Sequence, residues 1–149
     1  MRERIARHRA ERPREWLTVE EPLDLAGTCR RLVPQLDLIV VDCLTVWVAN
    51  LLDQGRDDAA ILAAADALAA VMGERSASLI IVSNEVGQGV HPPTAIGLRF
   101  RDLLGVVNQR IAAAADLVTL MVAGIPVPIK RAALGPPWSE RGDRSHEAP

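Results

Sequence analysis

The chain has 149 residues, of which 49% are hydrophobic, and its formal net charge is −2. This length suits one domain with a buried core, and the near-neutral charge argues against a general nucleic-acid-binding protein. The apolar runs are too short to span a bilayer and no apolar signal segment opens the chain, so we expect a soluble, cytoplasmic protein. Cys29 and Cys43 lack the spacing of metal ligands or of a disulfide framework, which predicts two reduced packing residues.

The first residues form a basic segment that is predicted to be helical from Met1 to Arg12. Arg4, His8 and Arg12 are spaced i, i+4, i+8, so a helix places them on one face. An α/β domain more often begins with a buried strand, and we therefore expect a chain whose beginning is missing. After Pro13, which ends the helix, residues 16–20 are predicted to form a short strand.

The segment from Leu36 to Asp42 is predicted to be the central strand. Its four consecutive apolar residues at 38–41 are typical of a strand that is buried on both faces of a parallel sheet. A helix is predicted before it, from Pro22 to Leu32. Ligands of open α/β sheets bind beyond the carboxyl ends of the strands, where Asp42 lies. Asp42 either holds Mg²⁺, directly or through water, or begins a turn or caps the next helix; this stretch alone favours the second alternative.

A second apolar strand, over residues 79–82, leads into a polar loop from Ser83 to Gly89, so polar residues again follow a strand. Gly87 and Gly89 would let the backbone approach a ligand, although turns also use glycine often. Thr94 is predicted to cap a long helix over residues 95–115. The remaining predicted elements are helices over 44–52 and 57–72, the latter with Gly73 as its C-terminal cap, a third buried strand over 117–122 and an extended segment over 125–130.

Strands and helices therefore alternate, with connections long enough for parallel crossovers. The predicted fold class is α/β, with a predominantly parallel sheet and flanking helices. Residues 1–130 are predicted to form the domain. The polar residues 131–149, rich in Gly and Pro, are predicted to form a disordered tail.

Several short segments, taken in order, resemble one family. They are Arg-Ile-Ala-Arg-His-Arg at 4–9, Thr-Val-Glu at 18–20, Asp-Cys-Leu-Thr at 42–45, Ser-Asn-Glu-Val-Gly-Gln-Gly at 83–89, Arg-Phe-Arg-Asp at 99–102 and Asn-Gln-Arg at 108–110. Together they are similar to the bifunctional adenosylcobinamide kinase/adenosylcobinamide-phosphate guanylyltransferases of cobalamin biosynthesis. Each segment alone is weak evidence, but their shared order makes the resemblance specific.

The resemblance implies a transferase with two activities. Such enzymes phosphorylate the aminopropanol hydroxyl of adenosylcobinamide with ATP or GTP, and then transfer GMP from GTP to that phosphate through a guanylylated histidine. His8 matches this histidine. Its attacking nitrogen must be unprotonated, and the surrounding arginine charges disfavour the protonated ring. The positions that match GTP contacts are Arg9, Ala10, Glu11, Arg12, Glu20 and Asp42, and Asp42 is also the expected Mg²⁺ ligand.

The resemblance also implies a phosphate-loop nucleotidase fold related to recombinase cores, assembled as a homotrimer, with no tightly bound cofactor. The sequence departs from the family pattern because it contains no Gly-x-x-x-x-Gly-Lys-Ser segment, and its one lysine is Lys130. In that segment the loop amides and the lysine hold the triphosphate. We therefore expect a truncated member that lacks the first strand, the phosphate loop and the first helix and has weak or no activity. The alternative is a non-catalytic nucleotide-binding or oligomer-forming subunit.

Overall fold

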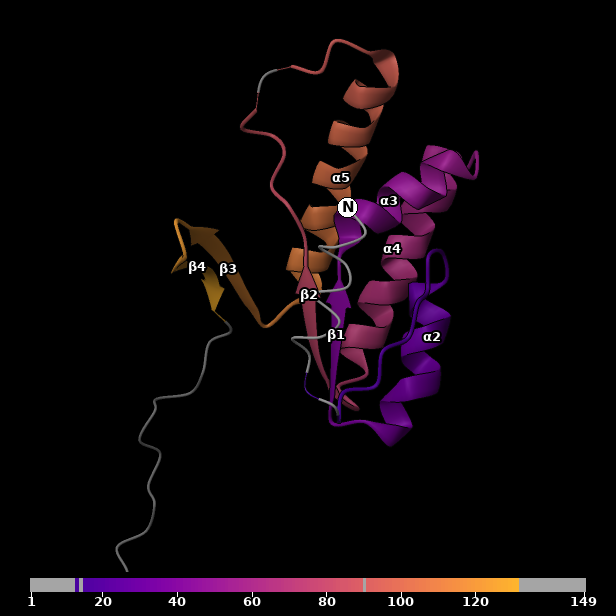
Figure 1. The fold of residues 1–149 in the computed structure, drawn as a ribbon, viewed down its shortest axis with the longest axis vertical. Helices are drawn as coiled ribbons and strands as arrows, with labels where there is room; N and C mark the ends of the chain where they lie inside the picture. Colours follow the sequence, from indigo (N-terminus) through magenta and orange to yellow (C-terminus); the bar gives the residue numbers. More distant parts are fainter. Residues whose placement is uncertain (1–12, 14, 90, 132–149) are drawn as a thin grey trace, which may run out of the picture.

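The computed structural model describes residue 13, residues 15–89 and residues 91–131. Its centre is a parallel pair of strands, β1 (Leu38–Asp42) and β2 (Ser78–Val82). The register pairs Asp42 with Val82, so both carboxyl ends lie at the same edge (Figure 1). A helix follows each strand along the chain. The predicted α/β class with parallel strands is therefore confirmed.

The helices build the core against one face of this strand pair. They are α2 (Leu25–Leu32), α3 (Leu44–Asp53), α4 (Asp58–Gly73) and α5 (Ala95–Ala114), with a short 3-10 helix η1 (Val33–Gln35) after α2. Their largest fully buried side chains are Leu44, Val48, Ile61, Leu68, Val71, Leu104 and Val107. The predicted bounds of α3, α4 and α5 are confirmed to within one residue, but Glu74 rather than Gly73 is the C-cap of α4. Among the described residues, no helix has the length and apolar character that a membrane crossing requires.

The prediction that β1 is buried on both faces is wrong for the described part of the chain. Ile39 and Val41 pack into the core, whereas Leu38 is 46% exposed and Val40 is 41% exposed. The neighbouring strand repeats this alternation, because Ile80 is 50% exposed. The physical reason is that the described helices cover a single face of the pair, so an apolar outer face is left open.

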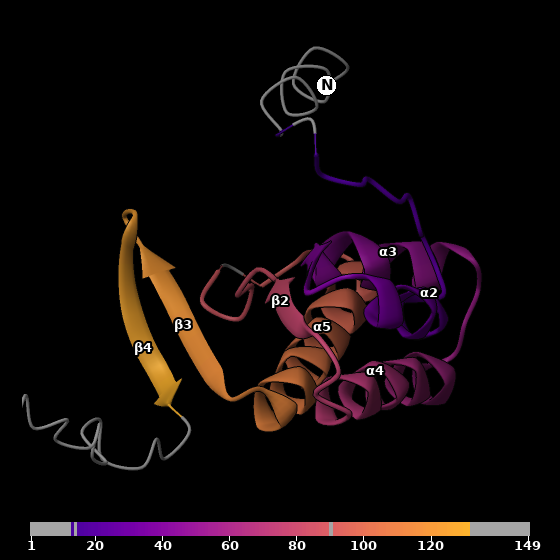
Figure 2. The same ribbon diagram turned by 90° about the horizontal axis from the view of Figure 1, so that it is seen from below.

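The third predicted strand exists, but it is not a buried member of the parallel sheet. β3 (Leu117–Val122) pairs antiparallel with β4 (Ile125–Arg131) in a separate hairpin. Ala123 and Gly124 form the turn with φ of 51° and 79°, and positive φ at both turn residues suits a two-residue hairpin. Figure 2 shows this hairpin standing apart from the helices. Arg131 belongs to β4, and the rest of the predicted tail lies outside the described residues.

The segment before α2 also differs from the prediction. Residues 16–20 are extended but form no strand, and the helix begins at Leu25 rather than at Pro22. Asp24 sets this start, because its side chain accepts a hydrogen bond from Gly27 N at 2.9 Å. Glu21 braces the residues just before the helix: its Oε1 accepts hydrogen bonds from Leu23 N at 2.9 Å and from Asp24 N at 2.8 Å.

These bonds predict a pH-dependent contribution of Glu21 to stability. The backbone donors of Leu23 and Asp24 hold the pKa of Glu21 below its ordinary value of 4.5. A lowered folded-state pKa gives stability that is present above pH 4.5 and is lost as the pH falls through the folded-state value. We expect Glu21→Gln to lower the free energy of unfolding near neutral pH, with the difference from the unmodified chain shrinking in acid. Urea denaturation at several pH values measures this, and a difference that is constant with pH would contradict it.

Candidate active site

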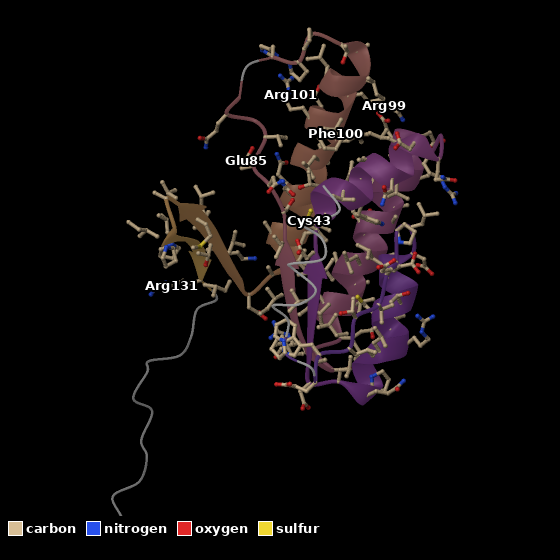
Figure 3. All side chains as sticks on the ribbon, in the orientation of Figure 1. Cys43, Glu85, Arg99, Phe100, Arg101 and Arg131 are labelled. Carbon is tan, nitrogen blue, oxygen red and sulfur yellow. The ribbon has the colours of Figure 1, made fainter. Side chains whose placement is uncertain are left out.

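The carboxyl ends of β1 and β2 form the candidate site. Asp42 is the last residue of β1, and its cross-strand partner Val82 is the last residue of β2, so the residues after each strand begin next to one another. Figure 3 shows Cys43 and Glu85 beyond the ends of these strands. Asp42 is exposed, and within the described part of the chain its side chain makes no hydrogen bond or ion pair. With respect to the described residues, the Asp42 carboxylate is therefore available to a ligand.

A chain of hydrogen bonds joins the loop after β2 to two helices. Ser83 Oγ donates to Asn108 Oδ1 of α5 at 2.6 Å, and Asn108 Nδ2 donates to the Asn84 carbonyl at 3.1 Å. On its other side, the Asn84 amide donates to Thr45 Oγ1 of α3 at 3.1 Å. The loop is thus fixed at its first two residues, Ser83 and Asn84, directly beside the end of β1. We name these four residues, Thr45, Ser83, Asn84 and Asn108, the polar clamp.

The next part of the loop contains two glycines, Gly87 and Gly89. Gly87 N donates to Glu85 Oε1 at 2.7 Å, and a Cβ built on Gly87 would lie 2.9 Å from that oxygen. That oxygen is the far end of a flexible side chain, so a small movement of Glu85 would make room for the added atom. A Cβ on Gly89 would meet only the Val86 carbonyl, at an ordinary 3.7 Å. The local packing therefore requires glycine at neither position, and the approach of a ligand to either glycine stays a prediction.

The predicted nucleotide contacts divide into two groups. His8, Arg9, Ala10, Glu11 and Arg12 lie outside the described residues. Glu20 is described and exposed, in the extended segment that leads to α2. That segment is held on α3, because Trp47 Nε1 donates to the Leu23 carbonyl at 2.8 Å and Asn50 Nδ2 donates to the Pro22 carbonyl at 3.3 Å. Glu20 therefore leads into a segment anchored on the helix that begins just after Asp42.

Sequence reasoning assigned no role to the polar clamp. Two features of the sequence could have indicated these residues. They are polar residues within the family-like segments, and three of them follow closely after an apolar strand. The contact between Asn108 and the loop joins residues 24 and 25 positions apart. No local pattern reveals such a contact, because it depends on where the packing of α5 against α3 and α4 places Asn108.

The described part of the chain has no group of three or more His, Cys, Asp or Glu side chains that could hold a metal by themselves. A cavity of about 630 Å³ lies at the opposite end of the strands, lined among others by Arg30, Asp37, Glu74 and Ser76. Asp37 and Ser76 precede β1 and β2, so this cavity is at the amino ends of the strands. Because parallel sheets bind ligands at their carboxyl ends, we place the candidate site at Asp42 instead.

The sequence matches one protein family along most of its length. Residues 1–129 match the family model described as cobinamide kinase / cobinamide phosphate guanyltransferase. The bifunctional adenosylcobalamin biosynthesis protein CobP of Pseudomonas aeruginosa is 44% identical over 133 residues, which cover 87% of this chain and 75% of that protein. The proteins named CobU of Salmonella typhimurium and Escherichia coli are 40% and 37% identical, each over 87% of this chain and 78% of the relative.

Proposed function

Because the chain belongs to the cobinamide kinase / cobinamide phosphate guanyltransferase family, we propose that it acts in both reactions of that family's name. It phosphorylates adenosylcobinamide with ATP or GTP and then joins GMP from GTP to the new phosphate, giving adenosyl-GDP-cobinamide. The structural observation that carries the proposal is the juxtaposition of the exposed Asp42 carboxylate and the polar clamp at the carboxyl ends of two parallel strands.

In the guanylyl transfer, His8 is the proposed nucleophile. An unprotonated ring nitrogen forms a bond to the α-phosphorus of GTP, and the bond from that phosphorus to the bridging oxygen breaks, so that pyrophosphate leaves. The phosphate of the corrinoid substrate then attacks the same phosphorus and releases the histidine. The arginines next to His8 in the sequence, Arg7, Arg9 and Arg12, stabilise the negative charge that develops on the phosphate oxygens.

The residues at the strand ends fit a magnesium ion that arrives with the nucleotide. Mg²⁺ in nucleotide sites is typically held by one or two carboxylates together with phosphate oxygens and water, and Asp42 offers one exposed carboxylate without a described partner. Asp42 would hold the ion, which would neutralise phosphate charge when bound. No tightly bound cofactor is proposed.

The test is covalent capture of GMP. We incubate the chain with GTP and Mg²⁺ and measure its intact mass, expecting a gain of one GMP that peptide mapping places on the peptide containing His8. We expect slow formation, because the sequence contains no Gly-x-x-x-x-Gly-Lys-Ser segment to hold the triphosphate. GMP in place of GTP is the control, since it has no pyrophosphate to release. If GTP also gives no gain in mass, the proposal that this chain transfers GMP is wrong.

A second candidate is a non-catalytic nucleotide-binding or oligomer-forming subunit. It is favoured by the apolar side chains on the open faces of β1 and β2, namely Leu38, Val40, Ile80 and Val82, because an exposed apolar surface is typical of contact with another polypeptide. A homotrimer of active chains would also use apolar surface. Sedimentation velocity combined with the GMP assay separates the two candidates: a chain that assembles without forming the adduct fits the second.

A further inference from the structure

The polar clamp fixes the direction of each of its hydrogen bonds. The Asn84 carbonyl can only accept, so the amino group of Asn108 must face it, at 3.1 Å. The Asn108 carbonyl oxygen then faces Ser83 Oγ at 2.6 Å, so the Ser83 hydroxyl donates to it. The Ser83 hydroxyl can therefore only accept a hydrogen bond from a ligand, because its proton is used by Asn108. Asn108 also holds the carbonyl of Asn84 in place.

The backbone amide of Asn84 determines which hydrogen bonds Thr45 can still make. The Asn84 amide donates to Thr45 Oγ1 at 3.1 Å, so one lone pair of that oxygen is used. Within the described part of the chain, the Thr45 hydroxyl proton has no acceptor. Thr45 lies three positions after Asp42, on the helix that begins beyond β1. Among the described residues, α3 thus carries one unused hydroxyl donor in its first turn, three positions after the exposed Asp42.

We propose that Thr45 donates its hydroxyl proton to a phosphate oxygen of bound GTP, and that Asn108 is the positioning residue that holds Thr45 in this state through Asn84. This inference rests on the proposed function, since it assumes that the nucleotide binds at the end of β1. A phosphate oxygen suits the geometry because it only accepts hydrogen bonds and because Mg²⁺ at Asp42 would hold the phosphates nearby. Guanine and ribose would bind elsewhere in the site.

The test compares the affinities for Mg²⁺-GTP and for guanosine, which lacks phosphates, by isothermal titration calorimetry. We expect Thr45→Val to weaken GTP binding by about ten- to a hundredfold, the range for one lost hydrogen bond to a charged group. Asn108→Ala acts through Asn84 and should weaken GTP binding by a smaller factor, and both variants should leave guanosine binding unchanged. Thr45→Ser keeps the hydroxyl and should restore GTP binding. Gln109→Ala is the matched control, because Gln109 is an exposed neighbour of Asn108 on α5.

The outcomes separate this inference from the proposed function. If Thr45→Val or Asn108→Ala binds GTP as tightly as the unmodified chain, the inference is wrong and the proposed function stands. If either variant loses affinity for GTP and guanosine equally, the residue is structural and the inference is also wrong. If the unmodified chain binds no GTP, both the inference and the proposed function of this chain fail. Thr45→Ser distinguishes a lost hydrogen bond from poor folding of Thr45→Val. Because serine keeps the hydroxyl, we expect Thr45→Ser to bind GTP as tightly as the unmodified chain, with guanosine binding unchanged.

Discussion

Replacing His8 with alanine is expected to abolish the GMP adduct that forms with GTP and Mg²⁺. The proposed reaction needs a ring nitrogen that bonds to the α-phosphorus, and alanine offers none, so the expected loss is complete rather than partial. The measurement is intact-protein mass spectrometry over a time course with saturating GTP. His8→Asn, which keeps a polar side chain without a nucleophilic nitrogen, should fail equally.

His91→Ala is the control for this experiment. His91 is an exposed residue of the loop before α5, where its ring contacts Arg101, and it is not part of the polar clamp. Its replacement should leave the rate of adduct formation unchanged. If the adduct persists in His8→Ala and disappears in His91→Ala, the nucleophile is in that loop and the role proposed for His8 is wrong.

Local patterns were sufficient for α3, α4 and α5 but not for the surfaces of the strands. The bounds of α5 followed from the cap at Thr94, whose side chain accepts from Gly97 N at 3.2 Å, and from the apolar spacing behind it. The apolar run of β1 indicates a strand, but it does not say what covers each face. In the described chain only the face of β1 that carries Ile39 and Val41 is covered. The apolar run alone therefore could not show whether one face or both faces are buried.

The placement of β3 failed for a related reason. Its apolar residues suited a buried parallel strand, and the sequence contains a competing signal in Ala123-Gly124, which permits a tight antiparallel turn. The hairpin is held to the body by Lys130, whose Nζ donates to the carbonyls of Ala112 and Ala113 at the end of α5 at 3.0 and 2.7 Å. A bond of this kind becomes visible only once the chain has folded back.

The candidate site also contains residues that could be placed from the sequence and one that could not. Parallel strands bring their carboxyl ends to one edge whatever the rest of the fold does, so Asp42 and the loop from Ser83 could be placed together from the sequence. Asn108 could not, because its role depends on a helix face meeting a loop far away along the chain. The only signal for Asn108 in the sequence was its presence in a family-like segment. Such a segment does not show which residues Asn108 contacts.

Replacing Asp42 with asparagine is expected to slow GMP adduct formation by about 10²–10³-fold, the usual effect of losing one fixed group that stabilises charge in the transition state. Asparagine keeps the shape of the side chain and removes the negative charge that Mg²⁺ prefers. We measure the initial rate of the mass gain at a series of Mg²⁺ concentrations. The variant should need more Mg²⁺ to reach half of its own maximal rate.

Asp37→Asn is the matched control. Asp37 is an exposed aspartate directly before β1, at the amino end of the strand that Asp42 ends, so it tests the same change of charge on the same strand away from the site. Its rate should equal that of the unmodified chain. An Asp42→Asn variant that is slow but has an unchanged Mg²⁺ requirement would mean that Asp42 contacts the nucleotide itself. An Asp42→Asn variant with a normal rate would remove Asp42 from the site, and with it the reason to place the nucleotide at this edge of the sheet.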